Sequence, residues 1–525
     1  MVTADPQRRS AALDEIQRIL ASGAPPADAE RLSQLAPLVF SAMPDALALR
    51  LPPATLARRI RECFQFVAHT VTPTFQLYKG LPGLHVSVHN PSDEEETIDR
   101  PIDGGPHEVT IVETHSPDAP FIFESLKNYF QKEGLRVFSA IHPLFTVRRQ
   151  WERIVWFGSA HDDGALELYC QFRIERVEAR ERQRRIEHQV YSVLKSVSLA
   201  VEDFPQMVGA TRALAPTLRS RTGRTADADV AREFLDWLLA DNYVLFGLLQ
   251  YTPGPDGVPE PDRNSALGAF RNPDLMPVVF PGFLEEQHAH MRPAANDDRI
   301  IDIDYCNNAT AIHHLEPIDD IVVREWGADG TLTRATLILG RLAKSAFAGR
   351  ALDVPLLREK LTRLHALSDA MPNSHVYREI RAIFNRLPKR ELFYASANEL
   401  KAIIEPMIEM SGDNEIAVAA REGAQYHAVS IAFSILRSSH RVEEELGAAL
   451  SAEFGPITFD TLADCGARAL LLYYFNAATL EHPIDVERVE EITRRVITTW
   501  ADRVAHTLEE VFGPLEGRRL FIRYV

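Results

Sequence analysis

The residues from Thr114 to Ser125, THSPDAPFIFES, combine charge, proline and a helix start in a way that suits a small-ligand site. A β-branched run ends here and an amphipathic segment begins, so the connection offers helix N-terminal amides and the positive end of a helix dipole. Those groups suit a carboxylate, and Asp118 could hold a cationic amine. The candidate amino-acid-binding residues are Asp118, Pro120, Phe121 and Ser125. A structural interpretation competes, in which Asp118 caps the helix, Pro120 is an early helical residue and Phe121 lies in the core.

Motifs for nucleotides, metals and serine nucleophiles are missing or weak. The sequence contains no GxGxxG, no GxxxxGK[ST] and no GxSxG, so we expect no nucleotide or acyl chemistry through those devices. His313, His314 and Glu316 could suggest a metal site, but adjacent residues of a strand point to opposite faces. No catalytic residue, metal or cofactor is therefore predicted in this chain.

Two pairs of aspartates could act as general acid and base or hold a hydrated cation. They are Asp302 with Asp304, and Asp319 with Asp320. Solvated carboxylates at strand edges and turns explain both pairs more simply. A hydrolase that uses Asp302, Asp304 and His313 stays as a minor hypothesis.

The composition excludes several classes of partner. The 525 residues carry 74 acidic and 57 basic side chains, a formal charge of −17, which argues against nucleic acid or an anionic membrane surface because both need positive patches. The four cysteines are widely separated and form no disulfide or zinc pattern, which fits a cytoplasmic protein. No run of 18 apolar residues occurs, so no membrane span is expected.

The elements around the candidate site are predicted from the spacing of apolar residues. Spacings of three and four indicate helices before residue 70, and the period changes from His107 onward. The predicted elements are helices at 12–21, 29–41 and 54–68, a strand at 108–114, a helix at 120–134 that ends at Gly134, several strands between 135 and 177, and a helix at 178–200. From residue 107 the order is strand, helix, strands, helix, which is typical of a ferredoxin-like module.

Two further cycles of the same kind follow along the chain. The second opens with a helix and strand in 233–251 and continues to a hairpin at 318–340. The third is centred on a helix at 441–454, and a last helix is predicted at 486–512. The predicted fold class is α+β, with several ferredoxin-like βαββ modules joined by helical segments.

Five motifs then occur in a fixed order. They are DAPFIFES (118–125), IHPLFTVRR (141–149), EFLDWLLADNYVLFGLLQY (233–251), LILGRLAKSAFAGRALDVPLLREKL (337–361) and SHVYREIRAIFNRLPKRELFYASANEL (374–400). Together they resemble the N-terminal region of the large bacterial NAD-dependent glutamate dehydrogenases, and the resemblance extends from about residue 107 to 525. Two positions depart from the family's pattern. An aspartate of its D-x-PFLVDS motif is Glu124 here, and an arginine of its S-x-VHR motif is His314.

The resemblance implies ACT-like regulatory modules in front of a catalytic domain that deaminates L-glutamate to 2-oxoglutarate and ammonium with NAD. The family's lysine-bearing substrate motif has no counterpart in this sequence, so the catalytic domain and its NAD are expected outside this chain. The expected domains are an N-terminal helical region (1–105), ACT-like module 1 (106–180), a helical linker (181–235), ACT-like module 2 (236–345), a helical segment (346–410), ACT-like module 3 (411–482) and a C-terminal helix (483–525).

The predicted function is therefore that of a non-catalytic regulatory and assembly region. Its expected partners are an amino-acid effector, further copies of itself and the catalytic domain of the same enzyme. The alternative is a free-standing ACT-type amino-acid-binding or scaffold protein.

Overall fold

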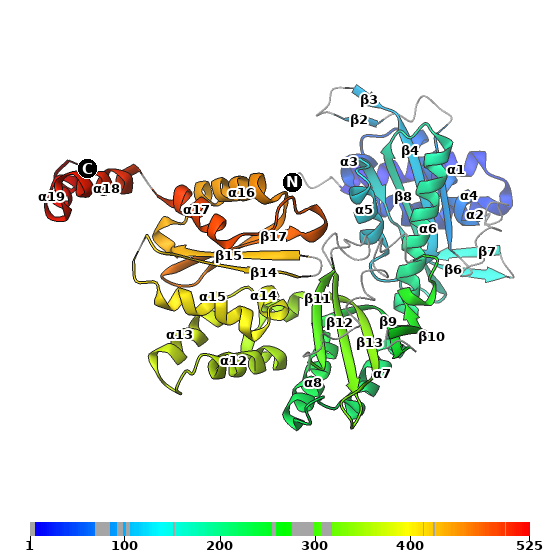
Figure 1. Cartoon of the computed structure of the whole chain (residues 1–525). Coiled ribbons are helices and arrows are strands. Elements are labelled where there is room, and N and C mark those ends of the chain that lie inside the picture. The colour runs from blue at the N-terminus through cyan, green and yellow to red at the C-terminus, as the bar shows by residue number, and fades with distance from the viewer. Residues whose placement is uncertain are drawn as a thin grey trace. The chain divides into compact units, whose positions relative to one another are not determined.

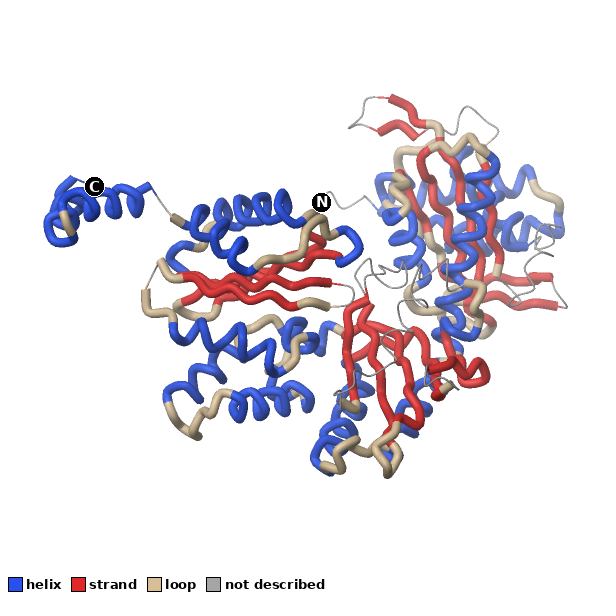
Figure 2. The backbone as a smooth tube through the Cα atoms, in the orientation of Figure 1, coloured by secondary structure: helices blue, strands red, loops and turns tan. Residues whose placement is uncertain are grey.

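The computed structural model describes residues 6–68, 84–91, 98–100, 105–150, 153–254, 259–275, 299–306, 318–412, 414–423, 426–498 and 500–524. The chain divides into two compact units, one built mainly from residues 1–205 and the other mainly from 206–525. Helices and small antiparallel sheets occur in both units (Figures 1 and 2), which confirms the predicted α+β class. Within the described ranges, no helix is both long and apolar enough to cross a membrane.

A six-stranded antiparallel sheet forms the centre of the first unit. Its strands are β1 (His85–His89), β4 (Val109–Pro117), β5 (Val137–Ile141), β6 (Leu144–Gln150), β7 (Arg153–Gly158) and β8 (Ala165–Glu175). They lie in the order β1-β4-β8-β6-β7, and β5 also pairs with β8. The short strands β2 (Ile98–Arg100) and β3 (Gly105–His107) pair with each other outside this sheet.

Helices cover both faces of this sheet (Figure 1). The helices of one face are α1 (Pro6–Gly23), α2 (Pro26–Ser41), α3 (Asp45–Ala48) and α4 (Pro53–Ala68); those of the other are α5 (Ile122–Lys132) and α6 (Arg180–Glu202). Alternate residues of β8 reach the two layers, because successive strand side chains point to opposite faces. Tyr169 shares a hydrophobic core with Ile60 and Phe64 of α4, whereas Phe172 packs on Phe130 of α5 with ring centroids 4.9 Å apart.

Helix α5 ends at Lys132, just before the glycine that the sequence predicted to terminate it. Gly134 has φ 67°, the left-handed conformation that glycine adopts without a steric penalty. The amide of Leu135 donates to the carbonyl of Phe130 at 2.9 Å, and that of Gly134 to Gln131 at 3.1 Å. These bonds satisfy carbonyls that would otherwise be left open at the end of the helix.

The last sheet of the second unit has the same connectivity as the strands β1, β4, β8 and β6 of the first sheet. Its elements in chain order are β14 (Ile416–Arg421), β15 (Tyr426–Ser434), α16 (His440–Phe454), β16 (Ile457–Asp464), β17 (Arg468–Asn476) and α17 (Val486–Ile497). The strands lie in the order β14-β15-β17-β16. This is the spatial order of a ferredoxin-like sheet, but the edge strand beside the first core strand comes first in the chain instead of last. Strand β1 stands in the same relation to β4 in the first unit.

The middle sheet differs from these two. Its strands are β9 (Tyr243–Pro253), β10 (Pro259–Gly268), β11 (Ile301–Cys306), β12 (Ile318–Trp326) and β13 (Leu332–Leu342), in the order β10-β9-β13-β12-β11. Only a 3-10 turn at Ala269–Arg271 occurs between its strands in the described residues, so they show no βαββ order. Helices α7 (Phe204–Leu214) and α8 (Thr225–Trp237) precede it.

A run of helices connects the middle and last sheets. They are α11 (Lys344–Ala348), α12 (Pro355–Leu367), α13 (His375–Phe384), α14 (Lys389–Tyr394) and α15 (Ala397–Glu409). Ser396 begins α15 with a capping box, since its hydroxyl accepts from the amide of Glu399 and the Glu399 carboxylate accepts from the amide of Ser396. Local sequence therefore sets where this helix starts.

Two helical predictions need correction. Residues within the expected helical region 1–105 form β1, which pairs with β4 from His85 to His89. The single helix predicted at 486–512 is two, because α17 ends at Ile497 and α18 (Trp500–Phe512) begins after it, followed by α19 (Pro514–Tyr524). Thr498 is extended (φ −72°, ψ 112°), and the β-branched residues at this point favour helix only weakly.

The glycine at the end of α5 gives a test of this local analysis. Gly134→Ala should lower the free energy of unfolding by about 1 kcal/mol, because alanine is strained at positive φ, and no heavy atom lies within 4 Å of the added methyl. Gly209→Ala, in the middle of α7 with equally open space, should raise it by up to about 1 kcal/mol. Urea unfolding of each variant against the parent chain measures both, and shifts of the same sign would contradict the assignment.

Candidate functional site

The connection between β4 and α5, together with the first turn of α5, carries the four residues predicted to bind an amino acid. The Asp118 amide donates to the Leu166 carbonyl of β8 at 3.0 Å, which ties the connection to the sheet. Asp118, Pro120 and Phe121 are exposed, whereas Ser125 is fully buried inside α5. The structure therefore brings three of the four together at the surface and places the fourth in the core.

The competing structural interpretation of this connection is wrong in all three details. Pro120 precedes the helix, which begins at Ile122, and is not an early helical residue. The residue that caps α5 is Phe121 with φ 72°, and no side chain caps the helix, so Asp118 is not its cap. Phe121 is 37% exposed and does not lie in the core. Partial burial raises the pKa of Asp118 above its ordinary value. Amino-acid binding at this connection stays a prediction.

A cleft of about 380 Å³ opens on the same sheet, on the face that α4 covers. It lies on the side of β4 and β8 that also carries Tyr169, away from α5 and α6. Seven of its ten lining residues are polar, and they carry charges of both signs. It is lined by Arg58, Glu62, Gln65 and Phe66 of α4, by His89, Asn90 and Pro91 at the end of β1, by Ile111 and Glu113 of β4, and by Gln171 of β8.

Hydrogen bonds fix the carboxylate at the floor of this cleft. The Tyr169 hydroxyl donates to Glu113 Oε1 at 2.6 Å, and Gln171 Nε2 donates to the Tyr169 oxygen at 3.0 Å. Burial and the charge of Glu113 raise the pKa of Tyr169 well above its ordinary value, so the phenol stays a donor. His89 Nδ1 lies 3.9 Å from Glu113 Oε2.

A second buried polar cluster lies farther along the same face. Glu167 accepts from His115 Nε2 at 2.7 Å and from Arg149 Nη2 at 2.9 Å. Burial alone would raise the pKa of Glu167, but these two donors lower it below its ordinary value. The rings of His85 and His115 stack with centroids 5.9 Å apart. Burial, His115 and Arg149 lower the pKa of His85 to about 4.

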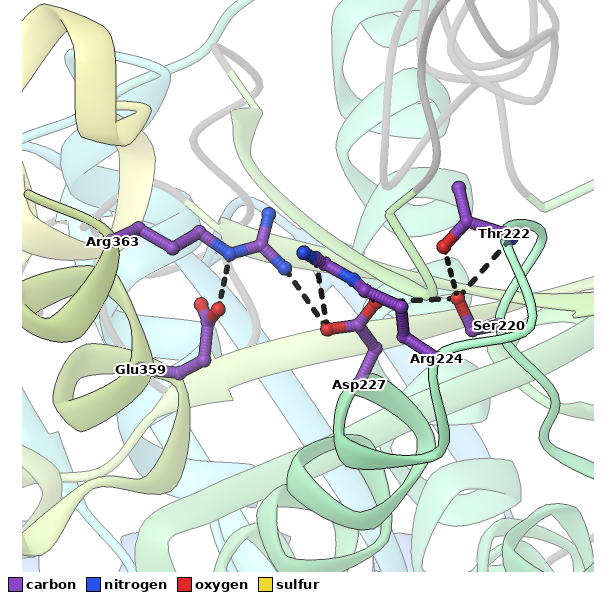
Figure 3. A network of polar contacts seen from close by, with 6 residues as sticks. All are labelled: Ser220, Thr222, Arg224, Asp227, Glu359 and Arg363. Atoms are coloured by element: carbon purple, nitrogen blue, oxygen red, sulfur yellow. Dashed lines mark hydrogen bonds and ion pairs between the residues drawn. The ribbon is translucent and has the colours of Figure 1, made fainter. Parts of the chain in front are cut away.

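The second unit contains a smaller cavity of about 140 Å³, between α8, α12 and β11. Figure 3 shows the ion pairs beside it. Asp227 of α8 accepts from Arg224 at 3.0 Å and from Arg363 of α12 at 3.2 Å, and Arg363 also pairs with Glu359. Ser220 Oγ donates to Asp227 at 3.2 Å. This network fastens α8 to α12.

The buried lysine of this cavity has a structural role. Lys360 donates to the carbonyls of Leu392, Phe393 and Ala395 at 2.8, 2.6 and 2.8 Å. Burial and the nearby Arg299 lower its pKa to about 7. Its three donors are occupied by the last carbonyls of α14 and the residue after it, so Lys360 closes the end of that helix.

A third cavity, of about 180 Å³, separates α14 and α15 from the last sheet. Glu391 of α14 is 1% exposed, accepts from the Tyr474 hydroxyl, and lies 3.3 Å from Arg421 Nη2. In the same helix, the Tyr394 hydroxyl donates to Asp319 of β12. Helix α14 therefore carries a polar contact to each of the two sheets.

The aspartate pairs are not the solvated carboxylates that the sequence suggested. Asp319 and Asp320 are 0% and 1% exposed in β12, and the Leu342 amide donates to Asp319 at 2.7 Å. Burial, and the charges of Asp304 and Asp302, raise the pKa of Asp320 well above its ordinary value. Asp302 pairs with Arg324 at 3.1 Å.

The rest of the hydrolase hypothesis is not supported by the described residues. His313, with His314 and Glu316, lies outside them. In the part of the chain that the structure describes, no group of three or more His, Cys, Asp or Glu side chains is placed to hold a metal ion.

Comparison with known proteins shows which proteins this chain is similar to. One family model, the ACT1 domain of glutamate dehydrogenase, matches residues 35–190, and another, helical motif 1 of glutamate dehydrogenase, matches 354–413. The NAD-specific glutamate dehydrogenase of Halomonas elongata is 24% identical over 460 residues, and that of Pseudomonas aeruginosa is 22% identical over 350. The chain is a relative of the large bacterial NAD-dependent glutamate dehydrogenases.

The matches to this glutamate dehydrogenase family agree with the packing. The ACT1 match begins inside α2 and ends inside α6, so it includes helices that share one hydrophobic core with the sheet. The alignments cover 84% and 64% of this chain, but only 28% of the Halomonas enzyme and 21% of the Pseudomonas enzyme.

The described residues do not form a Rossmann-type dinucleotide site. A Rossmann-type site lies at the carboxyl ends of parallel strands. Every strand pair with a defined register in the described part of this chain is antiparallel, and the glycine fingerprint is missing from the sequence.

Sequence reasoning missed the cleft beside α4, although the strands carried a signal. In β8, polar residues stand at every second position, namely Glu167, Tyr169, Gln171 and Arg173. Such a stripe in a strand that is apolar on its other face indicates a polar environment on one side. Nothing in the sequence tells which helix would cover that side.

The histidine pair predicts a dependence of stability on pH. Because the pKa of His85 falls from 6.5 to about 4 on folding, the unfolded chain binds the proton over that range and the folded chain does not. The free energy of unfolding of the first unit should therefore decrease as the pH falls from 6.5 toward 4. His85→Asn should reduce this dependence, measured as urea midpoints at several pH values. The exposed His161→Asn is the control, and equal slopes in the parent chain and His85→Asn would contradict the assignment.

The hydrogen bond from Tyr394 of α14 to Asp319 of the middle sheet should contribute to stability, so its removal should destabilise the chain. Tyr394→Phe leaves the buried Asp319 carboxylate without its hydroxyl donor, which should cost about 1 to 3 kcal/mol in unfolding free energy. Tyr377→Phe in α13, whose ring stacks on His365, should change stability by less than about 0.5 kcal/mol. Chemical denaturation compares the two, and equal losses would show that the Tyr394 hydroxyl is not important.

Proposed function

We propose that this chain is the regulatory and assembly region of an NAD-dependent glutamate dehydrogenase. The observation that carries the proposal is the pair of family matches, an ACT1 domain and a helical motif of that enzyme, in a chain that aligns with about a quarter of its curated relatives. Oxidative deamination of L-glutamate, and the NAD it consumes, then belong to a catalytic domain outside these residues. The proposal places the protein in the cytoplasm.

Open edges and exposed apolar side chains support an assembly role. In the last sheet, β16 is an edge strand in which Leu462 is 45% exposed, and unpaired strand edges are templates for association. In α18 and α19, Trp500, Leu515 and Ile522 are 64%, 90% and 75% exposed. Apolar surface of this kind is typical of a region that packs against another protein surface. We therefore propose that the chain forms homo-oligomers and contacts the catalytic domain.

An amino-acid effector is the second part of the proposal. ACT-like modules with a charged turn at Asp118 and a polar cleft beside α4 offer two places where such a ligand could bind. Regulation requires that the ligand binds two states of the protein with unequal affinity.

A free-standing amino-acid-binding or scaffold protein is the alternative, and the polar cleft favours it as much as it favours a regulatory region. Reading the coding sequence beyond Val525 separates the two. A continuous frame that encodes a catalytic domain supports the first, and a stop codon supports the second.

The proposal predicts that the chain alone does not turn over glutamate. Purified protein, mixed with L-glutamate and NAD, should form no NADH above a no-protein control, while an active glutamate dehydrogenase does so in the same buffer. Light scattering should give a mass that is a multiple of 59.0 kDa. Glutamate-dependent NADH formation would place the chemistry in this chain, and a monomer at micromolar concentration would contradict the assembly role.

A further inference from the structure

The cavity of about 180 Å³ beside the last sheet lies on the face opposite α16 and α17 (Figure 1). Its walls come from α14 and α15 and from the strands β14, β15 and β17. Its volume is comparable to the roughly 150 Å³ of an engineered protein cavity that binds benzene. The cavity therefore has room for a molecule of a few heavy atoms.

Small side chains on this face of the sheet leave the space beneath α15. Ala419, Ser430 and Leu472 lie side by side across β14, β15 and β17. Ala428 is two residues from Ser430 and therefore belongs to the same face. The opposite face carries larger residues such as Ile431, which share a hydrophobic core with α16 and α17. The register of the strands thus places alanine and serine where the cavity lies.

A buried guanidinium with an unused donor lines this cavity. The Arg421 side chain is 13% exposed, and its Nη2 lies 3.3 and 3.5 Å from the two carboxylate oxygens of Glu391. Its Nε is buried and has no hydrogen-bond partner in the part of the chain that the structure describes. Because a buried N–H without an acceptor is costly, a ligand that brings an acceptor to this atom would be stabilised.

The charges around the cavity favour an uncharged ligand. Glu391 pairs with Arg421 and also accepts from the Tyr474 hydroxyl. Glu399 lines the cavity as a second carboxylate. Burial alone would lower the pKa of Arg421, but Glu391 and Glu399 raise it above its ordinary value. An anionic ligand would meet these two carboxylates, and a cationic ligand would meet the guanidinium.

The hydrogen-bonding groups of the cavity include both a donor and an acceptor. Arg421 Nε supplies the donor. One carboxylate oxygen of Glu399 accepts from the Ser396 amide at 2.6 Å, and its other oxygen makes no hydrogen bond within the described residues. A primary amide matches this pair, because one neutral group carries a carbonyl acceptor and N–H donors. Ile403 and Leu472 supply apolar contacts for a short hydrocarbon group.

We propose that this cavity binds a small neutral amide, with its carbonyl oxygen at Arg421 Nε and its amide nitrogen at Glu399. Arg421 also holds Glu391 of α14, so the ligand would strengthen the contact between that helix and the last sheet. The same helix reaches the middle sheet through Tyr394, and the ligand would therefore tighten the link between the two sheets. The purpose of such a site rests on the regulatory part of the proposed function, whereas the binding itself is measured without any catalytic activity.

Ligand-detected NMR titration of the full chain with isobutyramide tests the proposal. Saturable binding of the amide is expected. Isobutyrate has the same shape but carries a negative charge, and 3-methyl-2-butanone keeps the carbonyl but lacks the N–H donors. Each of these two compounds should bind at least fivefold more weakly than the amide, because each loses one feature that the cavity matches.

Two variants alter the cavity without leaving Glu391 unpaired. Arg421→Lys keeps a positive charge beside Glu391 but cannot supply the Nε–H donor, and Ala428→Val fills part of the cavity. Each should weaken isobutyramide binding at least fivefold. Arg441→Lys, at an exposed side chain of α16, and Ala417→Val, at a residue of β14 outside the cavity lining, are the matched controls and should bind as the parent chain does.

Three results would overturn the proposal. They are no saturable binding of isobutyramide, isobutyrate binding at least as tightly as the amide, and amide binding unchanged by both Arg421→Lys and Ala428→Val. Thermal unfolding of each variant, followed by circular dichroism, guards against misfolding, since a variant that keeps its midpoint and loses binding has lost the site and not the fold. The NADH and light-scattering results that test the proposed function do not depend on any of these outcomes.

Discussion

Buried carboxylates on covered sheet faces set the main constraint on this structure. Glu113 and Glu167 lie beneath helices in the first unit, and Asp319 and Glu391 lie between sheets and helices in the second. A carboxylate removed from water without partners costs several kcal/mol, so each must find donors within the fold. Phenol hydroxyls, an imidazole, guanidinium groups and a backbone amide supply them. The helices that bury these groups can therefore pack in only a few ways.

In the second unit, buried carboxylates connect the six-residue helix α14 to both sheets. Helix α14 sends Glu391 toward the last sheet and Tyr394 toward the middle sheet, and Lys360 closes its carbonyl end. Propensity alone would not hold so short a helix in water. Its stability comes from the burial of Leu392 and Phe393 and from polar contacts on either side. The polar contacts join two sheets that have different topologies.

The sequence predicted local features well and long-range pairing poorly. The span of α5 and its terminal Gly134 followed from periodicity and capping, because both depend on neighbours in the chain. The pairing of β1 with β4 did not, since a strand of five residues carries little pattern of its own. The burial of Asp319 and Asp320 was also missed, because acidic residues in a strand usually indicate solvent. The cleft gathers Arg58, Glu113 and Gln171 from distant segments, and only tertiary packing brings them together.

The early position of the edge strand changes how the last sheet can assemble. In a ferredoxin-like chain order, the edge strand would pair with the first core strand across an intervening helix, two strands and a second helix. Here β14 pairs with β15 as a hairpin, with Arg421 opposite Ala428. Local pairings close short loops at little entropic cost, and folding rates rise as the mean sequence separation of contacts falls. The reordered strand therefore gives this module a lower contact order, and a hairpin that can form before the helices dock.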